Sequence, residues 1–255
     1  MHLVQDFHAL FSIQSLISLL TLSVLEIVLG IDNIIFISIA SNKLPRASQG
    51  RARTIGLLLA LIMRILLLFS ITWITNLQSA LFTIADFGVT GRDIILFSGG
   101  VFLLYKTTIE LHNKIEGYDE SEMKVRKVSF NAIVLQIVLI DIVFSFDSIL
   151  TAVGLVSNLL IMIAAVIIAM IIMIIFSGRV SDFINDNPTI KVLALAFLLM
   201  IGVMLIMQSF HHEVDKRYIY ISIAFSFFVE ILNVRMRKKE AKRKRDTNND
   251  PRDII

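Results

Sequence analysis

The chain has 255 residues, 56% of them hydrophobic, and a mean hydropathy of +0.79. Its apolar residues gather in runs of about twenty, the length that spans roughly 30 Å of hydrocarbon, so a water-soluble globular protein is excluded. There is no cysteine, which excludes disulfides and thiolate metal sites. The net charge of +3 comes largely from a basic tail beside an apolar run, a topology signal and not a nucleic-acid-binding surface.

The apolar runs predict an all-α, polytopic membrane protein with seven transmembrane helices. In chain order the expected spans are 14–40, 54–75, 93–111, 130–156, 158–178, 189–209 and 217–234. The first run has no basic leader and no small-residue cleavage site, so we expect a retained helix and not a signal peptide. Residues 1–235 then form one seven-helix membrane domain, and 236–255 form a basic tail that we expect to be disordered.

The loops between the spans predict the orientation of the chain. Lysine and arginine concentrate in three places, at 43–53, 114–127 and 235–245, and are sparse in the loops between them. The positive-inside rule therefore puts the C-terminus in the cytoplasm and the N-terminus outside. An odd number of spans agrees with that assignment.

An acidic pair occurs twice, each time within a long apolar run, with its two carboxylates six residues apart and a small polar residue after the second. The residues are Glu26, Asp32 and Asn33 in the first run and Asp141, Asp147 and Ser148 in the second. A charge at bilayer depth costs a few kcal/mol or more, so such residues usually face a partner or a wet cavity. Four acids in matching positions of two halves predict a cation site.

The doubled motif belongs to a wider internal repeat. A shift of 115 residues places Glu26 on Asp141, and a later shift near 99 brings 92–112 onto 190–211 with a similar pattern. Repeat one would cover 14–111 and repeat two 130–209, leaving 217–234 as an extra helix. Because each repeat has three spans, the two would enter the membrane from opposite sides, as in many secondary transporters whose site lies between the repeats.

Helical geometry places some of these polar residues on common faces. Glu26 and Asn33 are seven residues apart and share a face, and Asp141, Ser145 and Ser148 form one polar stripe. Their ligand atoms are hard oxygen donors, which suit Mg²⁺, Ca²⁺ or Mn²⁺ better than Zn²⁺ or Cu⁺. The alternative is a set of acids that hydrogen-bond between packed helices, in part protonated.

The first acidic pair leaves two conformations open. Glu26 and Asp32 point about 120° apart on a regular helix, so they either face different neighbours or lie on either side of a break. Gly30 stands between them and makes a break plausible, and a break would free backbone carbonyls as ligands.

Three further polar residues lie within the predicted spans. Arg64 is mid-span and could pair with one of the acids and tune the site, or hold helices together. Glu230 and Asn233 share a face of the last span, where Glu230 could line the pathway, pair with Arg64 or lie near the cytoplasmic interface. We count these residues and Ser145 as accessory candidates. Gly99 and Gly100 are expected to allow close helix contact.

Two segments, LEIVLGIDNIIFISI and DIVFSFDSILTAVGL, resemble the TerC family of integral membrane proteins. The resemblance covers almost the whole chain and points to the short branch, because nothing after the last span could form a CBS-type domain. It implies a seven-span fold related to the LysE-type exporters, location in the bacterial inner membrane, and metal-ion homeostasis with manganese efflux as the best-supported activity. The family name refers to a tellurium-resistance phenotype.

The family motif carries over onto six residues as the expected metal ligands: Glu26, Asp32, Asn33, Asp141, Asp147 and Ser148. The first hypothesis is therefore a divalent-cation exporter, with Mn²⁺ transported and no cofactor, driven by protons or the membrane potential because no P-loop is present. The expected partners are the metal cation, the lipid bilayer, and further copies or other membrane proteins, without nucleic acid.

Two alternatives come from other classes of protein. The first is a membrane scaffold or assembly factor in metal or tellurite stress resistance, which would use the loop 112–129 and the tail 236–255 to dock partners. The second is an exporter of a small organic cation or amino acid, since carboxylates also suit an ammonium group. An enzyme is not expected, because no nucleophile–base constellation is present.

Overall fold

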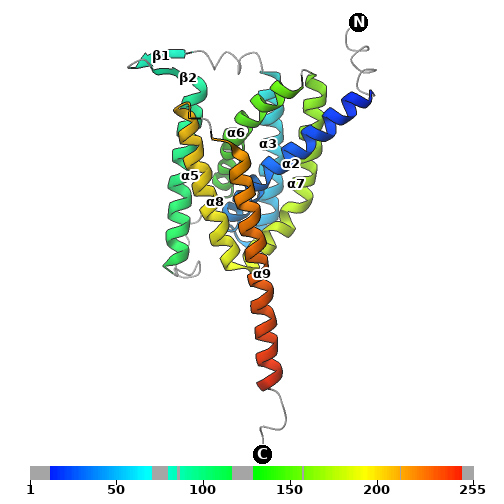
Figure 1. The fold of residues 1–255 in the computed structure, drawn as a ribbon, viewed down its shortest axis with the longest axis vertical. Coiled ribbons are helices and arrows are strands. Elements are labelled where there is room, and N and C mark those ends of the chain that lie inside the picture. Colours follow the sequence, from blue (N-terminus) through cyan, green and yellow to red (C-terminus); the bar gives the residue numbers. More distant parts are fainter. Residues whose placement is uncertain are drawn as a thin grey trace, which may run out of the picture.

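The computed structural model describes residues 12–70, 80–84, 87–116, 129–156, 158–212 and 214–248. Helices dominate this part of the chain (Figure 1). They are α2 (Ile13–Ser41), α3 (Arg46–Phe69), α5 (Gly91–Ile115), α6 (Phe130–Leu155), α7 (Leu159–Asp186), α8 (Pro188–Ser209) and α9 (Lys216–Asn248). An antiparallel hairpin of β1 (Ala80–Ile84) and β2 (Phe87–Thr90) precedes α5 at one end of the bundle.

The helices confirm a polytopic membrane protein. Among the described residues, six helices are long and apolar enough to cross a membrane, and α6 contributes a shorter apolar stretch, Phe130–Phe146. Each predicted span falls on one of the seven helices. The helices differ from the expected spans mainly where polar residues extend them, as in α3, which begins at Arg46, and α7, which continues to Asp186. The end of the second predicted span falls in 71–79, outside the described residues.

The main helix contacts join the first three helices to the second three. α2 packs on α7, α3 on α6, and α5 on α8, and these are the most extensive contacts between elements. Suppose that the repeat pairs α2 with α6, α3 with α7 and α5 with α8. Exchanging the members of each pair then turns the α2–α7 contact into the α6–α3 contact and leaves the α5–α8 contact unchanged. An inverted repeat produces this exchange of partners, although the bounds of the two repeats stay a prediction.

The helix α2 is continuous through Gly30, so of the two conformations left open for the first acidic pair the structure has the regular helix. Gly30 serves packing instead, because a Cβ there would overlap the sulfur of Met173 on α7. Small residues let membrane helices approach closely. The most extensive contact between helices in the described part of the chain is that of α5 with α8.

The contact between α5 and α8 depends on two facing glycines. A Cβ on Gly100 would lie 2.8 Å from the backbone oxygen of Gly202, and a Cβ on Gly202 would lie 2.9 Å from the Leu104 side chain. A Cβ on Gly99 would overlap Val143 of α6. The prediction that Gly99 and Gly100 allow close helix contact is therefore confirmed.

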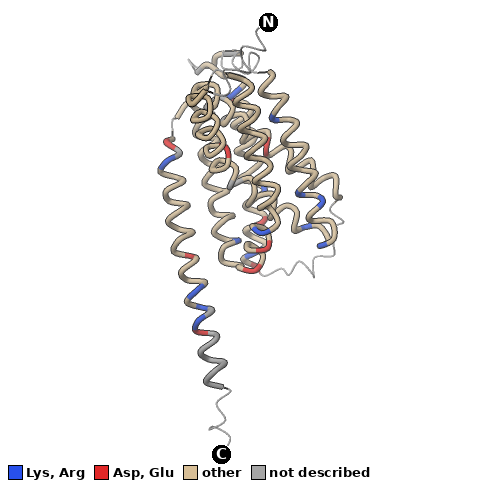
Figure 2. The backbone as a smooth tube through the Cα atoms, turned by 90° about the vertical axis from the view of Figure 1, so that its right-hand side faces the viewer, with Lys and Arg blue, Asp and Glu red and all other residues tan. Residues whose placement is uncertain are grey.

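The last helix, α9, extends well beyond the rest of the bundle (Figures 1 and 2). It continues to Asn248, so residues 236–248, part of the tail expected to be disordered, are helical in the structure. The physical reason is composition, because Arg, Lys, Glu and Ala are good helix formers. Residues 249–255 lie outside the described part of the chain. Exposed apolar side chains such as Ile221, Phe225 and Phe228 suit contact with lipid.

A buried carboxylate holds the start of α5. The hydroxyl of Thr90 accepts a hydrogen bond from the backbone N–H of Asp93 (3.1 Å), and the Asp93 carboxylate accepts one from the Thr90 N–H (2.9 Å). The ring nitrogen Nε2 of His211, which follows α8, lies 3.0 Å from the same carboxylate. Asp93 thus caps one helix and joins it to the end of another.

We expect Asp93→Ala to lower the free energy of unfolding by about 1–2 kcal/mol, because it removes the carboxylate half of the capping box and the contact of that carboxylate with His211. Thermal unfolding of purified protein in detergent measures the change. Asp215→Ala is the matched control: Asp215 pairs with the exposed Arg217 in solvent, so its loss should change stability little. Equal losses in the two variants would contradict this role of Asp93.

Candidate functional site

The side chain of Arg64 lies between Glu26 and Asp141, the two acids that the predicted repeat would make equivalent. Its Nη1 donates to Oε2 of Glu26 on α2 at 2.6 Å, and its Nη2 donates to Oδ1 of Asp141 on α6 at 2.9 Å. Its Nε donates to the hydroxyl of Ser145 at 2.9 Å. Arg64, Glu26 and Asp141 are each only 2% exposed. One cation from α3 therefore bridges an acid from each half of the molecule in the interior.

The shared faces predicted from helical spacing are confirmed around this ion pair. Nδ2 of Asn33, seven residues after Glu26, donates to Oδ1 of Asp141 at 3.1 Å. The hydroxyl of Ser145 donates to Oδ2 of Asp141 at 2.9 Å. Ser148 lies near the Glu26 carboxylate, but its hydroxyl donates to the Ser145 carbonyl at 3.3 Å. We call Glu26, Asn33, Arg64, Asp141, Ser145 and Ser148 the polar cluster.

The polar cluster retains negative charge and free acceptor atoms. With both acids ionised, two negative charges face the single positive charge of Arg64. Oε1 of Glu26 and Oδ1 of Asn33 are buried and have no hydrogen-bond partner among the described residues. A buried acceptor without a donor costs about 1–3 kcal/mol, so such atoms are rare without a reason. The cluster can thus accept a further cation or proton.

Two of the predicted ligands cannot be placed at the level of side chains. The helical positions of Asp32 and Asp147 lie on α2 and α6, but their side chains are outside the described part of the structure. Each Cα lies about 9 Å along its helix from Glu26 or Asp141, at 1.5 Å per residue. Among the described side chains no group of three or more His, Asp or Glu gathers as a metal site.

Glu230 and Asn233 belong to another part of the molecule. Nδ2 of Asn233 donates to Oε2 of Glu230 at 3.3 Å, and the Glu230 carboxylate lies beside Thr189 at the start of α8. The structure gives Glu230 these two neighbours and no pairing with Arg64 among the described residues, so that one of the three places weighed for Glu230 is wrong. The reason is that α9 packs on α8 at the edge of the bundle and not on α2 or α3.

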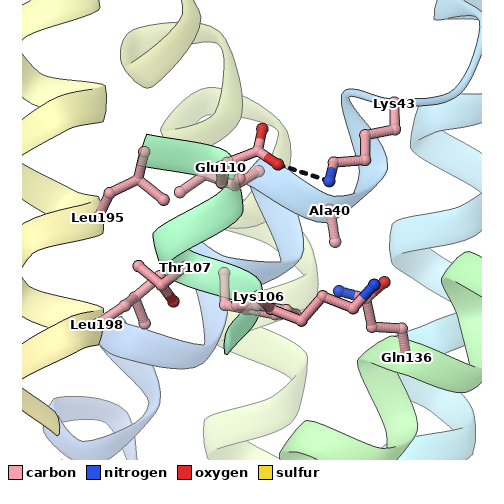
Figure 3. A pocket seen from close by; sticks show the side chains of 10 residues that line it. Ala40, Lys43, Lys106, Thr107, Glu110, Gln136, Leu195 and Leu198 are labelled. Carbon is pink, nitrogen blue, oxygen red and sulfur yellow. Dashed lines mark ion pairs between the residues drawn. The ribbon is translucent and has the colours of Figure 1, made fainter. Parts of the chain in front are cut away.

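A narrow pocket lies between the two halves, toward the end of the bundle from which α9 projects (Figure 3). It begins one turn past Asn33, at Phe36 of α2, and includes Gln136 on α6 and Thr107 on α5. Its room is at most that of one water molecule. Figure 3 shows Lys106 of α5 extending toward Gln136 of α6 across this space.

An ion pair and several hydrogen bonds connect helices at the same end of the bundle. Nζ of Lys43, just after α2, lies 2.5 Å from Oε2 of Glu110 on α5 (Figure 3). Asn42 and Asn185 of α7 exchange side-chain hydrogen bonds at 2.5 and 3.1 Å. Arg53 of α3 donates to the hydroxyl of Ser181 on α7 at 2.9 Å. The end of α2 is therefore tied both to its own half and to the other.

These contacts follow only in part from the sequence. A lone cation within an apolar span needs a partner, which makes Arg64 a candidate, but helical spacing does not indicate that it bridges both acids. The pair of Lys43 and Glu110 was missed altogether. Its members lie in ordinary polar positions at span ends, and no spacing rule links residues so far apart in the chain.

Comparison with known proteins assigns this architecture to a family. The model of the integral membrane protein TerC family matches residues 11–245. The UPF0053 inner membrane protein YoaE of Escherichia coli K12 is 49% identical over 216 residues, which are 84% of this chain and 42% of YoaE. The UPF0053 inner membrane protein YgdQ of the same strain is 48% identical over 219 residues, 86% of this chain and 92% of YgdQ.

The UPF0053 protein YegH of Escherichia coli K12 is 48% identical over 216 residues, and 41% of its length is matched. This chain therefore spans about two fifths of the length of YoaE and YegH, but nearly all of YgdQ. No solved structure matches the chain significantly.

Proposed function

Because the chain belongs to the TerC family of integral membrane proteins, we propose that it is a transporter that exports a divalent metal cation. Mn²⁺ is the first candidate. The single observation that carries the proposal is the meeting of Glu26 and Asp141, equivalent acids of the two repeats, in the buried polar cluster. Intramembrane acids of this kind mark ion pathways.

The chemistry of the polar cluster supports a hard divalent cation. Its available atoms are carboxylate, amide and hydroxyl oxygens, and two of them lack a donor among the described residues. Oxygen ligands suit Mg²⁺, Ca²⁺ and Mn²⁺. The family resemblance, with its link to metal-ion homeostasis, favours Mn²⁺ among these. In the proposed export, Asp32 and Asp147 supply further carboxylates.

Polar contacts across one end of the bundle support transport by alternating access. The Lys43–Glu110 and Asn42–Asn185 contacts join helices on the side from which α9 projects, and Lys43 and Glu110 also line the narrow pocket. Under the proposed orientation this is the cytoplasmic side of the bacterial inner membrane. Loading from the cytoplasm would require these contacts to open while the repeats move against each other.

We expect saturable binding of Mn²⁺ to the purified protein and its loss in the double variant Asp32→Asn, Asp147→Asn. Calorimetry in detergent, with Mg²⁺, Ca²⁺ and Zn²⁺ in parallel, measures binding, and efflux from loaded vesicles measures transport. Asp186→Asn, at the exposed end of α7, is the matched control and should behave as the parent. Unchanged transport in the double variant would refute the proposed site.

One observation favours a second candidate, export of a small organic cation or amino acid. The two acids already hold a planar guanidinium, so their spacing accepts an organic cation. Competition separates the two functions: lysine or arginine that displaces Mn²⁺ at millimolar concentration would favour the organic substrate. The scaffold alternative predicts instead that removal of residues 236–255 abolishes function, whereas transport should survive the removal.

A further inference from the structure

Arg64 occupies the point where a cation shared by the two halves would bind. Its guanidinium contacts Oε2 of Glu26 and Oδ1 of Asp141, at 2.6 and 2.9 Å, and has a third partner in Ser145. Arginine stays protonated in proteins, so this positive charge cannot leave by losing a proton. The only way to free those two oxygen atoms is to move the side chain.

A metal ion and the guanidinium would compete for the same atoms. A divalent ion that bridges the acids binds their oxygens at about 2.0–2.6 Å, along the lone pairs that Arg64 now uses. Oε1 of Glu26 and Oδ1 of Asn33 remain without a donor among the described residues, so an incoming ion can contact them first. Full coordination by both acids then requires the guanidinium to withdraw.

We propose that Arg64 is a tethered counter-cation, which competes with the transported ion for Glu26 and Asp141 and sets the affinity of the site. This inference rests on the proposed function. When the ion leaves, the guanidinium returns and neutralises acids that would otherwise repel each other in a low-dielectric interior. A transporter needs binding that is strong enough to load and weak enough to release, and a built-in competitor lowers the affinity.

Calorimetry on four proteins tests this competition: the parent, Arg64→Gln, Arg64→Lys and Arg53→Gln. We expect Arg64→Gln to bind Mn²⁺ at least tenfold more tightly than the parent, since its amide carries no charge. Arg64→Lys should bind Mn²⁺ 3- to 10-fold more tightly than the parent, because a lysine ammonium lacks the planar set of N–H donors with which the guanidinium holds two carboxylates. Arg53→Gln is the matched control on α3, where the arginine bonds Ser181 and no acid of the cluster, and its affinity should be unchanged.

Stability gives a second readout that does not need transport. In chelator, Arg64→Gln should unfold at a lower temperature than the parent, because two buried acids lose their cation. Mn²⁺ should restore most of that loss, so the metal-induced rise in unfolding temperature should be larger in the variant than in the parent. A purely structural role for Arg64 predicts the opposite: weaker metal binding and no rescue.

The outcomes separate this inference from the proposed function. If the parent binds Mn²⁺ and Arg64→Gln binds it equally or more weakly, the competition is refuted while the transporter proposal stands. If only the Arg64 variants bind, the competition is supported in its strongest form. If none of the four proteins binds a divalent cation, both proposals fail. Should Arg64→Gln not fold even with metal, Arg64→Lys decides, and an affinity at or below that of the parent refutes the inference.

Discussion

Asp141→Ala is expected to lower the free energy of unfolding by about 3–5 kcal/mol, the cost of removing one partner from a buried ion pair. The Asp141 carboxylate accepts hydrogen bonds from Arg64, Asn33 and Ser145. Alanine would leave these donors facing a cavity and would leave Arg64 with Glu26 alone. Reversible unfolding in detergent, followed by circular dichroism, measures the loss.

Asp141→Asn serves as the matched variant because it keeps the size and one acceptor oxygen. It leaves Arg64 and Glu26 as a pair with equal and opposite charges, so we expect it to retain more stability than Asp141→Ala. The polar cluster then carries no excess negative charge, so we expect Asp141→Asn to lose divalent-cation binding despite its stability. If Asp141→Ala were as stable as the parent, the polar cluster would not hold the two halves together. If Asp141→Asn bound metal normally, Asp141 would not be a ligand.

The two variants separate stability from binding, which a single alanine substitution cannot do. The distinction matters because hydrogen bonds between membrane helices often stabilise a protein less than the cost of an unpaired polar group in hydrocarbon would suggest. The ionic part of the cluster should dominate, since charge-assisted hydrogen bonds are roughly twice as strong as neutral ones. Five such contacts meet around Arg64 and Asp141.

What the sequence predicted well is what lies along a single helix. The shared face of Glu26 and Asn33 and the stripe of Asp141, Ser145 and Ser148 follow from helical periodicity, and the structure places them together. The positions of the seven long helices follow equally from the apolar runs. These are local properties, which the order of residues determines directly.

What the sequence predicted poorly depends on contact between helices. The depth and rotation of α3 decide that Arg64 reaches both acids, and packing sets these. The choice between a regular helix and a break at Gly30 stayed open for the same reason: a glycine in a membrane helix can serve flexibility or close approach, and only the presence of Met173 on α7 distinguishes them. Glu230 had the right chemistry but lies on a helix at the edge of the bundle.

Gly100→Ala is expected to destabilise the protein by about 1–3 kcal/mol through overpacking. The added methyl group would lie 2.8 Å from the carbonyl oxygen of Gly202, and a backbone atom cannot turn aside as a side chain can. The two helices would have to separate along one of the most extensive contacts between the halves. Thermal unfolding in detergent measures the effect.

Two other glycines provide graded controls within the same kind of helix. Gly154→Ala on α6 meets no atom within 4 Å, so it should be neutral or slightly stabilising, since alanine is the better helix former. Gly30→Ala meets the flexible end of Met173, which can rotate away, so its cost should fall between the other two. From the most to the least stable variant, the expected order is therefore Gly154→Ala, Gly30→Ala and Gly100→Ala. If Gly100→Ala unfolded no earlier than Gly154→Ala, the α5–α8 contact could not be as close as the backbone positions imply.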